Sequence, residues 1–474
     1  MPNPTSRCGP RRSAVVPAAL LLLASCAAAR PNPDAESQAA RAVNLHGALT
    51  FRTDAGPLDV AHPTDILTLS DAIERAVTTS PELQAALARV RIAMADADQA
   101  RLLPNPVLDV AVRMGSGSPQ IDATVGQELL VLFQMPRRAS AADHRLRQTA
   151  CDAVTVALGV AADSQELYAS AQASEATGAL LQERLAILDR LTTVARSRLD
   201  AGEGTRGDLA SLEAQRVELE VEIAQSEQDN LVHRLRLARL IGEPSSNADW
   251  RLEPWSPAAA PTLTVSAWVE AALLNRPEVQ AASWKLRALG DEQSLTELTQ
   301  WDGGRGGVDS AKDDAWAVGP SVSTPIPVFD TGSARRARLT AEQYEARHEW
   351  TSTRRRVVED VRTAHQALSG LAAQLRTVRD ALLPLQQRRR ALAEDAYRAG
   401  QVDVTPVLLA EHDLTLAQER AVALEREARA AMIRLEQAVG GSGVAARLRA
   451  RNTVSSTEAP PSPLPPPPSK GLRP

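Results

Sequence analysis

Apolar residues recur every three or four positions over two very long stretches of this chain. The first runs from about 138 to 200 and holds no Pro and two Gly, and the second runs from about 334 to 398. Such spacing predicts single helices of about 60 residues, each roughly 90 Å long. The two helices are expected to end at Gly202 and Gly400, and a helix of about 35 residues is expected to follow each of them. The second long helix is also expected to kink at Pro384. Patterns this long are typical of coiled coils or helical tubes.

A period of two appears between the predicted helices. Stretches 107–114 and 316–329 alternate between an apolar face and a polar or small-residue face. A return strand is expected at 123–133, whereas the Gly-rich stretch 303–310 predicts only a weak strand. Apolar outer and polar inner faces are typical of transmembrane β-barrel strands. A soluble hairpin packed on a helix is the alternative.

The chain contains an internal duplication. Residues 67–91 and 263–287 align without a gap and share 11 of 25 residues. Further matches follow at nearly the same offset, which predicts two repeats, 67–242 and 263–440, each with the order helix, strand, strand, helix. The linker between them, 243–262, contains four Pro and is expected to be a loop.

Both repeats open with the same helix signals. Ser70 and Ser266 are the candidate N-caps of the first helix in each repeat. Pro81 and Pro277 follow a short break and are expected to restart a helix, since Pro is favoured in the first turn.

Composition narrows the class of protein. The chain has 474 residues and a net charge of −5, and its 44% hydrophobic and 23% charged residues exclude wholesale disorder and a polytopic helical membrane protein. Only 3% of residues are aromatic, which favours thin helix-on-helix packing through Ala and Leu. The near-neutral charge gives no basic footprint, so no nucleic-acid partner is expected. The predicted fold class is mainly α, with four β-strands per chain.

Residues 1–25 resemble a bacterial lipoprotein signal peptide. Three Arg precede a short apolar run, and residues 23–26 read Leu-Ala-Ser-Cys, which resembles a lipobox. We therefore expect Cys26 to be the lipidated N-terminus, followed by an N-terminal extension at 26–66. Ala27 instead of Asp after the Cys resembles outer-membrane sorting. An ordinary signal with a chance Cys is the alternative.

The remaining cysteine and the C-terminal segment give no functional motif. Cys151 is left without a disulfide partner and is expected to be a small buried apolar residue. Residues 441–474 end in a Pro-rich run and are predicted to form a disordered tail. A spacer or a partner-binding peptide is the alternative for that tail.

Several segments, in order and twice over, resemble the TolC-type outer-membrane efflux channel family. They are the strand entry at 102–106, the strand exit at 318–330, and the Ala-Gly turns at 201–202 and 399–400. The resemblance covers about 67–440. It implies a homotrimer whose strands form one shared β-barrel in the outer membrane and whose helices form one tunnel in the periplasm.

Strand counting supports oligomerisation independently of the resemblance. Four strands are too few to close a membrane barrel, and open sheet edges do not persist in lipid. Two copies would supply eight strands and three copies twelve. The choice of three comes from the resemblance.

The resemblance also implies partners and contact residues. Family members are outer membrane factor lipoproteins of tripartite efflux systems, and they dock on a periplasmic adaptor (membrane fusion protein) and an inner-membrane pump. In the family, the helix turns farthest from the membrane meet the adaptor. On this chain those positions are Gly202, Thr205, Arg206, Asp208, Gly400 and Asp403. Both Gly residues can also simply cap their helices.

One departure from the family concerns the periplasmic entrance. Family members often carry Asp just after the second turn, forming a selective ring, whereas residues 404–409 contain no acid here. Asp208 and Asp403 lie close to the two turns and are candidates for that role. Helix capping is the alternative for both.

The sequence contains no catalytic or metal-binding constellation. Its seven His form no His-x-x-x-His pair, and there is no Cys-x-x-Cys, no phosphate-binding loop and no Met cluster. We therefore expect no enzyme activity, no cofactor and no metal site. The predicted function is a passive exit duct for small molecules or metal ions. A lipid-anchored periplasmic scaffold or adaptor without a pore is the alternative, and the paired strand segments favour the duct.

Overall fold

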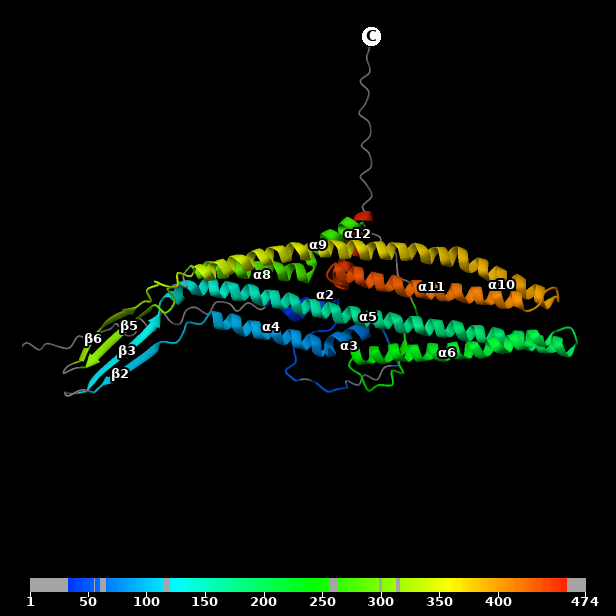
Figure 1. The fold of residues 1–474 in the computed structure, drawn as a ribbon, viewed down its shortest axis with the longest axis horizontal. Helices are drawn as coiled ribbons and strands as arrows, with labels where there is room; N and C mark the ends of the chain where they lie inside the picture. Colours follow the sequence, from blue (N-terminus) through cyan, green and yellow to red (C-terminus); the bar gives the residue numbers. More distant parts are fainter. Residues whose placement is uncertain are drawn as a thin grey trace, which may run out of the picture.

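The computed structural model describes residues 33–54, 56–59, 65–114, 119–255, 263–297, 301–312 and 316–457. They form a long, thin body of helices lying side by side, with a small β-sheet at one end and two helical turns at the other (Figure 1). Cys26 lies outside the described residues, as does the Pro-rich segment after residue 457.

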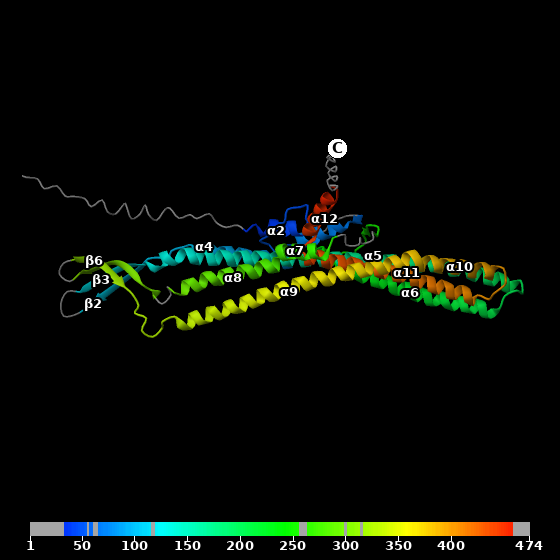
Figure 2. The same cartoon turned by 90° about the horizontal axis from the view of Figure 1, so that it is seen from above.

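One series of elements occurs twice along the chain. The first series is α3 (Leu69–Thr79), α4 (Pro81–Ala100), β2 (Val107–Arg113), β3 (Gln120–Glu128), α5 (Leu130–Asp200) and α6 (Arg206–Leu240). The second is α7 (Val265–Asn275), α8 (Pro277–Thr296), β5 (Arg305–Lys312), β6 (Trp316–Ser323), α9 (Ser333–Thr377), the π-helical turn η2 (Val378–Leu382), α10 (Leu383–Arg398) and α11 (Thr405–Ala438). The described residues form four further elements: α2 (Ala35–Ala42), β1 (Ile66–Leu67), β4 (Arg251–Leu252) and α12 (Ser442–Thr457). Helices α2 and α12 lie beside the middle of the body (Figure 2).

The N-cap of the first helix in each repeat lies two residues before the predicted cap. Thr68 is the N-cap of α3, and its hydroxyl accepts the backbone N–H of Asp71 at 3.0 Å. Thr264 takes the corresponding position in α7. The assignment of Ser70 and Ser266 as caps was therefore wrong, because the chain is still extended at the two Thr residues and already helical at the two Ser residues.

The long helices are longer and less regular than their periodicity indicates. Helix α5 has 71 residues, or about 106 Å of helix rise, and accommodates Pro136 near its start. Residues 130–133 open this helix, so the expected return strand at 123–133 is instead the earlier β3. Near Pro384, where a kink is predicted, the structure has the π-helical turn η2, which ends two residues before that Pro. Pro lacks the N–H of a regular helix, which accounts for the break there.

The four-stranded sheet is antiparallel throughout and has the order β2-β3-β5-β6. Strand β5 forms although its Gly-rich sequence has little apolar character. A Cβ at Gly307 would lie 2.2 Å from the carbonyl oxygen of Val125, so the close approach of β3 requires glycine at this position. Strand β6 ends at Ser323, before Pro325 and Pro327, which cannot donate to a strand ladder.

The core is thin, as the scarcity of aromatics predicts. Most of its buried side chains are Ala, Val and Leu, and its main clusters follow the contacts between adjacent helices. Among the described residues, the largest fully buried side chains are Trp268, Tyr168 and Tyr397. Cys151 is 4% exposed and therefore confirmed as a buried residue.

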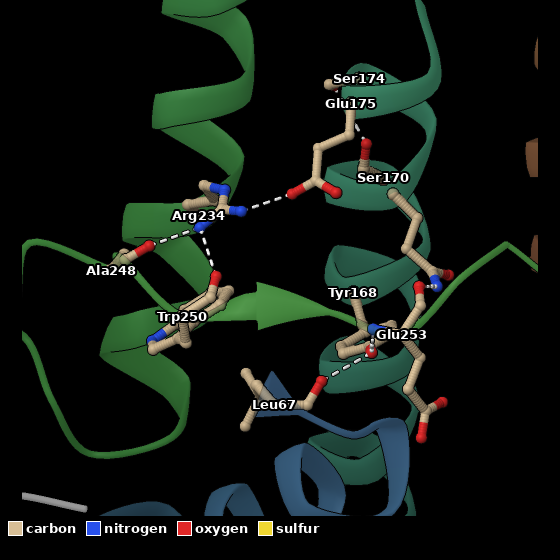
Figure 3. A network of polar contacts seen from close by, with 10 residues as sticks. Leu67, Tyr168, Ser170, Ser174, Glu175, Arg234, Ala248, Trp250 and Glu253 are labelled. Atoms are coloured by element: carbon tan, nitrogen blue, oxygen red, sulfur yellow. Dashed lines mark hydrogen bonds and ion pairs between the residues drawn. The ribbon is translucent and has the colours of Figure 1, made fainter. Parts of the chain in front are cut away.

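A polar network holds the linker segments against the middle of the body (Figure 3). Strands β1 and β4 pair in parallel beside α5, where the Tyr168 hydroxyl donates to the carbonyl of Leu67 at 2.8 Å and accepts the N–H of Glu253 at 2.9 Å. Arg234 on α6 donates to the carbonyl of Trp250 at 2.8 Å and pairs with Glu175. The network thus joins both ends of the first repeat.

The region predicted as a disordered tail, 441–474, begins with a helix instead. In α12, Val444 and Ala445 are buried in the cluster that contains Trp268. Gly441 lies in the left-handed region at φ +111°, and a Cβ there would be 2.2 Å from the carbonyl oxygen of Ala42. The prediction failed for residues 442–457 because the short apolar segment of α12 is stabilised by contacts with distant parts of the chain, which local sequence does not reveal.

Candidate functional site

The two helical turns far from the sheet lie next to each other (Figure 1). Gly202 ends α5 at φ +77°, and Gly400 ends α10 at φ +69°. Their N–H groups donate to the carbonyls of Leu199 and Tyr397, each at 3.0 Å. Both glycines are exposed, and their left-handed conformation is the capping role expected for glycine at this position.

The other predicted contact residues occupy the starts of the following helices. Thr205 is the N-cap of α6, and its hydroxyl accepts the N–H of Asp208 at 3.0 Å. Arg206 is the first residue of α6, and Asp208 lies in the first turn, where the helix dipole favours a carboxylate. Asp403 precedes α11, and its carboxylate accepts the hydroxyl of Thr405 at 3.3 Å.

Two residues that the sequence analysis did not select join the turns into one unit. Arg198, in the last turn of α5, donates to the carbonyl of Tyr397 at 3.1 Å and stacks 4.8 Å from the centre of its ring. Tyr397 is 1% exposed and packs with apolar side chains of both turns, including Leu212 and Val404. A basic residue at a helix C-terminus is common, so the sequence carried no specific signal for Arg198.

The acidic residues closest to the second turn on α11 are held by α10. Arg390 pairs with Glu411 at 3.0 Å, and Arg389 pairs with Asp413. Burial is the main cause that raises the pKa of Glu411 above its ordinary value. These two carboxylates therefore stabilise the contact between α10 and α11.

The sheet at the opposite end has two chemically different faces. Paired positions such as Leu108, Val125 and Val308 build one apolar face across β2, β3 and β5, and Val318 and Val322 extend it on β6. Leu108 is 64% exposed and Val322 82%, so the described chain leaves this face uncovered.

The second face of the sheet is polar. Thr124 donates to Asp309 at 2.7 Å, and Arg113 pairs with Asp122 at 3.3 Å. The alternation predicted at 107–114 is thus confirmed as two opposite faces, and the one predicted at 316–329 is confirmed up to Ser323, where β6 ends.

The described residues contain neither a membrane-spanning helix nor a metal-binding cluster. None of the described helices combines the length and the apolar character needed to cross a membrane. In the same part of the chain, no three His, Cys, Asp or Glu residues are arranged to hold a metal ion.

A family model described as outer membrane efflux protein matches the chain twice, at residues 72–243 and 268–441. The chain belongs to the outer membrane efflux protein family. The two matches together cover well over half of the chain, and each falls on one of the two repeats.

Relatives and solved structures agree with this membership. The outer membrane efflux protein BepC of Brucella suis is 25% identical over 274 residues, a match that spans 55% of this chain and only 59% of that relative. The pyoverdine export outer membrane protein OpmQ of Pseudomonas aeruginosa is 24% identical over 406 residues, or 79% of this chain and 85% of OpmQ.

Two outer-membrane proteins of known structure share the fold, each with a TM-score of 0.66. The channel OprN is 19% identical, and its alignment covers 79% of this chain and 90% of OprN. VceC of Vibrio cholerae is 18% identical, and its alignment covers 79% of this chain and 96% of VceC. The predicted family and the predicted fold class are confirmed. This family is one of passive outer-membrane efflux channels and not of enzymes.

Proposed function

We propose that this chain forms the homotrimeric exit duct of a tripartite efflux system, anchored through a lipidated Cys26, and that it exports small molecules or metal ions. The observation that carries the proposal is the four-stranded sheet. Its apolar face is exposed and its edge strands β2 and β6 are open, so a single chain leaves backbone groups without partners. Lipid would cover the apolar face, and neighbouring copies would supply hydrogen-bond partners for the backbone groups at both edges.

The helices support the same assembly. In the half of the body near the turns, α6 packs on α5, α5 on α11, and α11 on α10, so α6 and α10 are the edges of the layer. Val217, Val221 and Leu235 form an exposed stripe on α6, opposite to the side that Leu212 and Leu219 bury against α5. Such an apolar stripe is suited to packing against a second copy.

Charge favours α10 as the helix that covers this stripe. Between residues 208 and 229, α6 carries seven acidic residues and one Arg, whereas α10 carries four Arg and two acidic residues. Leu385 and Leu392 on α10 are 61% and 71% exposed, seven residues apart, and therefore lie on one face. Opposite charges beside matching apolar stripes would bring the edges of adjacent copies together.

The turns supply the docking surface for the adaptor in this proposal. Gly202, Gly400, Thr205 and Asp403 are exposed at the far end of the body, and Arg198 holds the two turns as one unit. Together with Arg206 and Asp208, they would contact the helical tip of an adaptor, which in turn reaches the inner-membrane pump.

Two measurements test the assembly and the pore. Native mass measurement of the detergent-extracted protein should give three chains, and the same sample should conduct in planar bilayers. A monomer, or a trimer that binds bilayers without conducting, would favour the poreless scaffold.

The lipid anchor is tested separately. Cells supplied with labelled palmitate should incorporate it into the wild-type protein and not into the variant Cys26→Ala. Unlabelled wild-type protein with its N-terminus upstream of residue 26 would contradict the anchor and leave the pore proposal intact.

A further inference from the structure

Two of the three Phe residues of the chain are exposed at matching places of the two repeats. Phe133 lies near the start of α5 and is 73% exposed, and Phe329 precedes α9 and is 101% exposed. Both helices begin at the sheet end of the body (Figures 1 and 2). Exposed Phe side chains are unfavourable in water, so their repetition here indicates an apolar environment at this level.

Each Phe is accompanied by other exposed apolar side chains. Leu129 and Leu132 are 48% and 47% exposed beside Phe133 in sequence, and Ile326 and Val328 are 80% and 68% exposed before Phe329. These side chains lie where β3 leads into α5 and where β6 leads into α9.

An Arg pair follows each apolar segment. Arg137 and Arg138 follow Phe133, and Arg335 and Arg336 follow Phe329. Arg137 pairs with Asp291 at 3.2 Å, and Arg335 pairs with Asp330.

The second Arg of each pair differs from the first. Arg138 and Arg336 are half-buried, and no carboxylate among the described residues lies within ion-pair distance of either. Between residues 129 and 142 the sequence holds two Arg and no acid, and between 326 and 341 it holds three Arg and one Asp. Both segments therefore carry a surplus of positive charge next to exposed apolar groups.

We propose that these two segments, 129–138 and 326–336, form binding sites for the headgroups of anionic phospholipids in the periplasmic leaflet of the outer membrane. The inference rests on the proposed function, because it places the sheet in the membrane and the helices in the periplasm. At that boundary Phe133 and Phe329 lie among acyl chains, and Arg138 and Arg336 donate to lipid phosphate. Each chain supplies one site from each repeat, and together they set the depth of the channel in the bilayer.

The test compares lipid binding by the detergent-extracted full-length protein. Phosphatidylglycerol or phosphatidylcholine is titrated, and bound lipid is counted by native mass measurement. We expect the wild type to prefer phosphatidylglycerol and the double variant Arg138→Gln/Arg336→Gln to bind it roughly 25-fold more weakly, since each basic residue near an anionic surface contributes about fivefold. The double variant Arg190→Gln/Arg420→Gln, which removes two exposed Arg residues of the distant helical half, should bind like the wild type.

A second pair of variants distinguishes a lipid site from a phosphate site. Phe133→Ser/Phe329→Ser should weaken phosphatidylglycerol binding, and inorganic phosphate at the same concentration should not compete for it. Equal binding of both lipids by the wild type, unchanged binding by the Arg double variant, or full competition by inorganic phosphate would overturn the inference. Because trimer mass and conductance are measured on the same samples, a conducting trimer without lipid preference refutes this inference alone, whereas loss of the trimer or the pore refutes the proposed function.

Discussion

At the residue scale, the hydroxyl of Tyr168 illustrates how one polar group connects distant segments. Tyr168 is 1% exposed, and burial raises its pKa to about 12, so the hydroxyl stays protonated and available as a donor. It bonds to the backbone of both β1 and the segment after β4. The second repeat has a similar contact, in which a His365 ring nitrogen lies 3.3 Å from the carbonyl of Leu263.

We predict that Tyr168→Phe lowers the free energy of unfolding by about 1–3 kcal/mol, because it leaves the buried carbonyl of Leu67 and the partly buried N–H of Glu253 without their partner. Urea unfolding followed by circular dichroism measures the change. Tyr344→Phe is the matched control, since Tyr344 is 56% exposed. Equal stability of both variants would show that water replaces the lost hydroxyl.

Cys151 provides a second prediction at this scale. Burial, and next the carboxylate of Asp152, raise the pKa of the thiol to about 12 from an ordinary 9.0. Below pH 10 the side chain is therefore an un-ionised thiol, and alkylation requires the thiolate. We expect native protein to resist iodoacetamide between pH 7 and pH 10 and to react fully in denaturant, as measured by mass spectrometry. A native labelling rate that levels off near pH 9, as for a thiol of ordinary pKa, would contradict this.

At the element scale, strand β5 depends on glycine for its close approach to β3. The variant Gly307→Ala places a methyl group against the backbone of β3, and we predict that it abolishes assembly of the sheet and insertion into the outer membrane. Gly319→Ala on β6 is the control, because a Cβ at that position has nothing within 4 Å. The amount of heat-resistant trimer in outer-membrane fractions reports the outcome, and equal amounts for both variants would contradict the steric argument.

The exposed stripe on α6 is the second feature at this scale. Val221 is 67% exposed, so a charged replacement costs little within one chain but would be buried if another copy covers the stripe. We predict that Val221→Glu reduces the trimer at least tenfold, while Val221→Leu leaves it unchanged, as measured by native mass or crosslinking. Wild-type amounts of trimer with Val221→Glu would exclude this face from the contact between copies.

At the scale of the whole molecule, the long helices separate the sheet from the turns by about 106 Å of helix rise in α5. Membrane insertion and adaptor docking are therefore placed at opposite ends, and a change at one end should not disturb the other. The Thr205→Trp/Asp403→Trp variant tests this separation. We predict that it abolishes efflux without lowering the amount of trimer in the outer membrane, as measured by substrate accumulation and immunoblotting. Unchanged efflux together with unchanged adaptor crosslinking would refute docking at the turns.

The sequence alone determined the periodic part of this protein. Helical spacing, the Pro residues at 81 and 277 and the glycines at 202 and 400 specify where helices run, restart and end, because each acts through its own backbone conformation. The duplication and the alternating strand faces could also be predicted from the sequence, because both are patterns along the chain.

Only the tertiary structure decided the features that depend on distant neighbours. Strand β5 exists because β3 and β6 pair with it, and α12 exists because its apolar side chains pack beside Trp268. The two turns are joined because Arg198 contacts Tyr397. The register that pairs Gly307 with Gly126 also arises between strands far apart in sequence. Each of these interactions joins segments that are far apart in the sequence. A pattern within one segment therefore could not have specified the interaction.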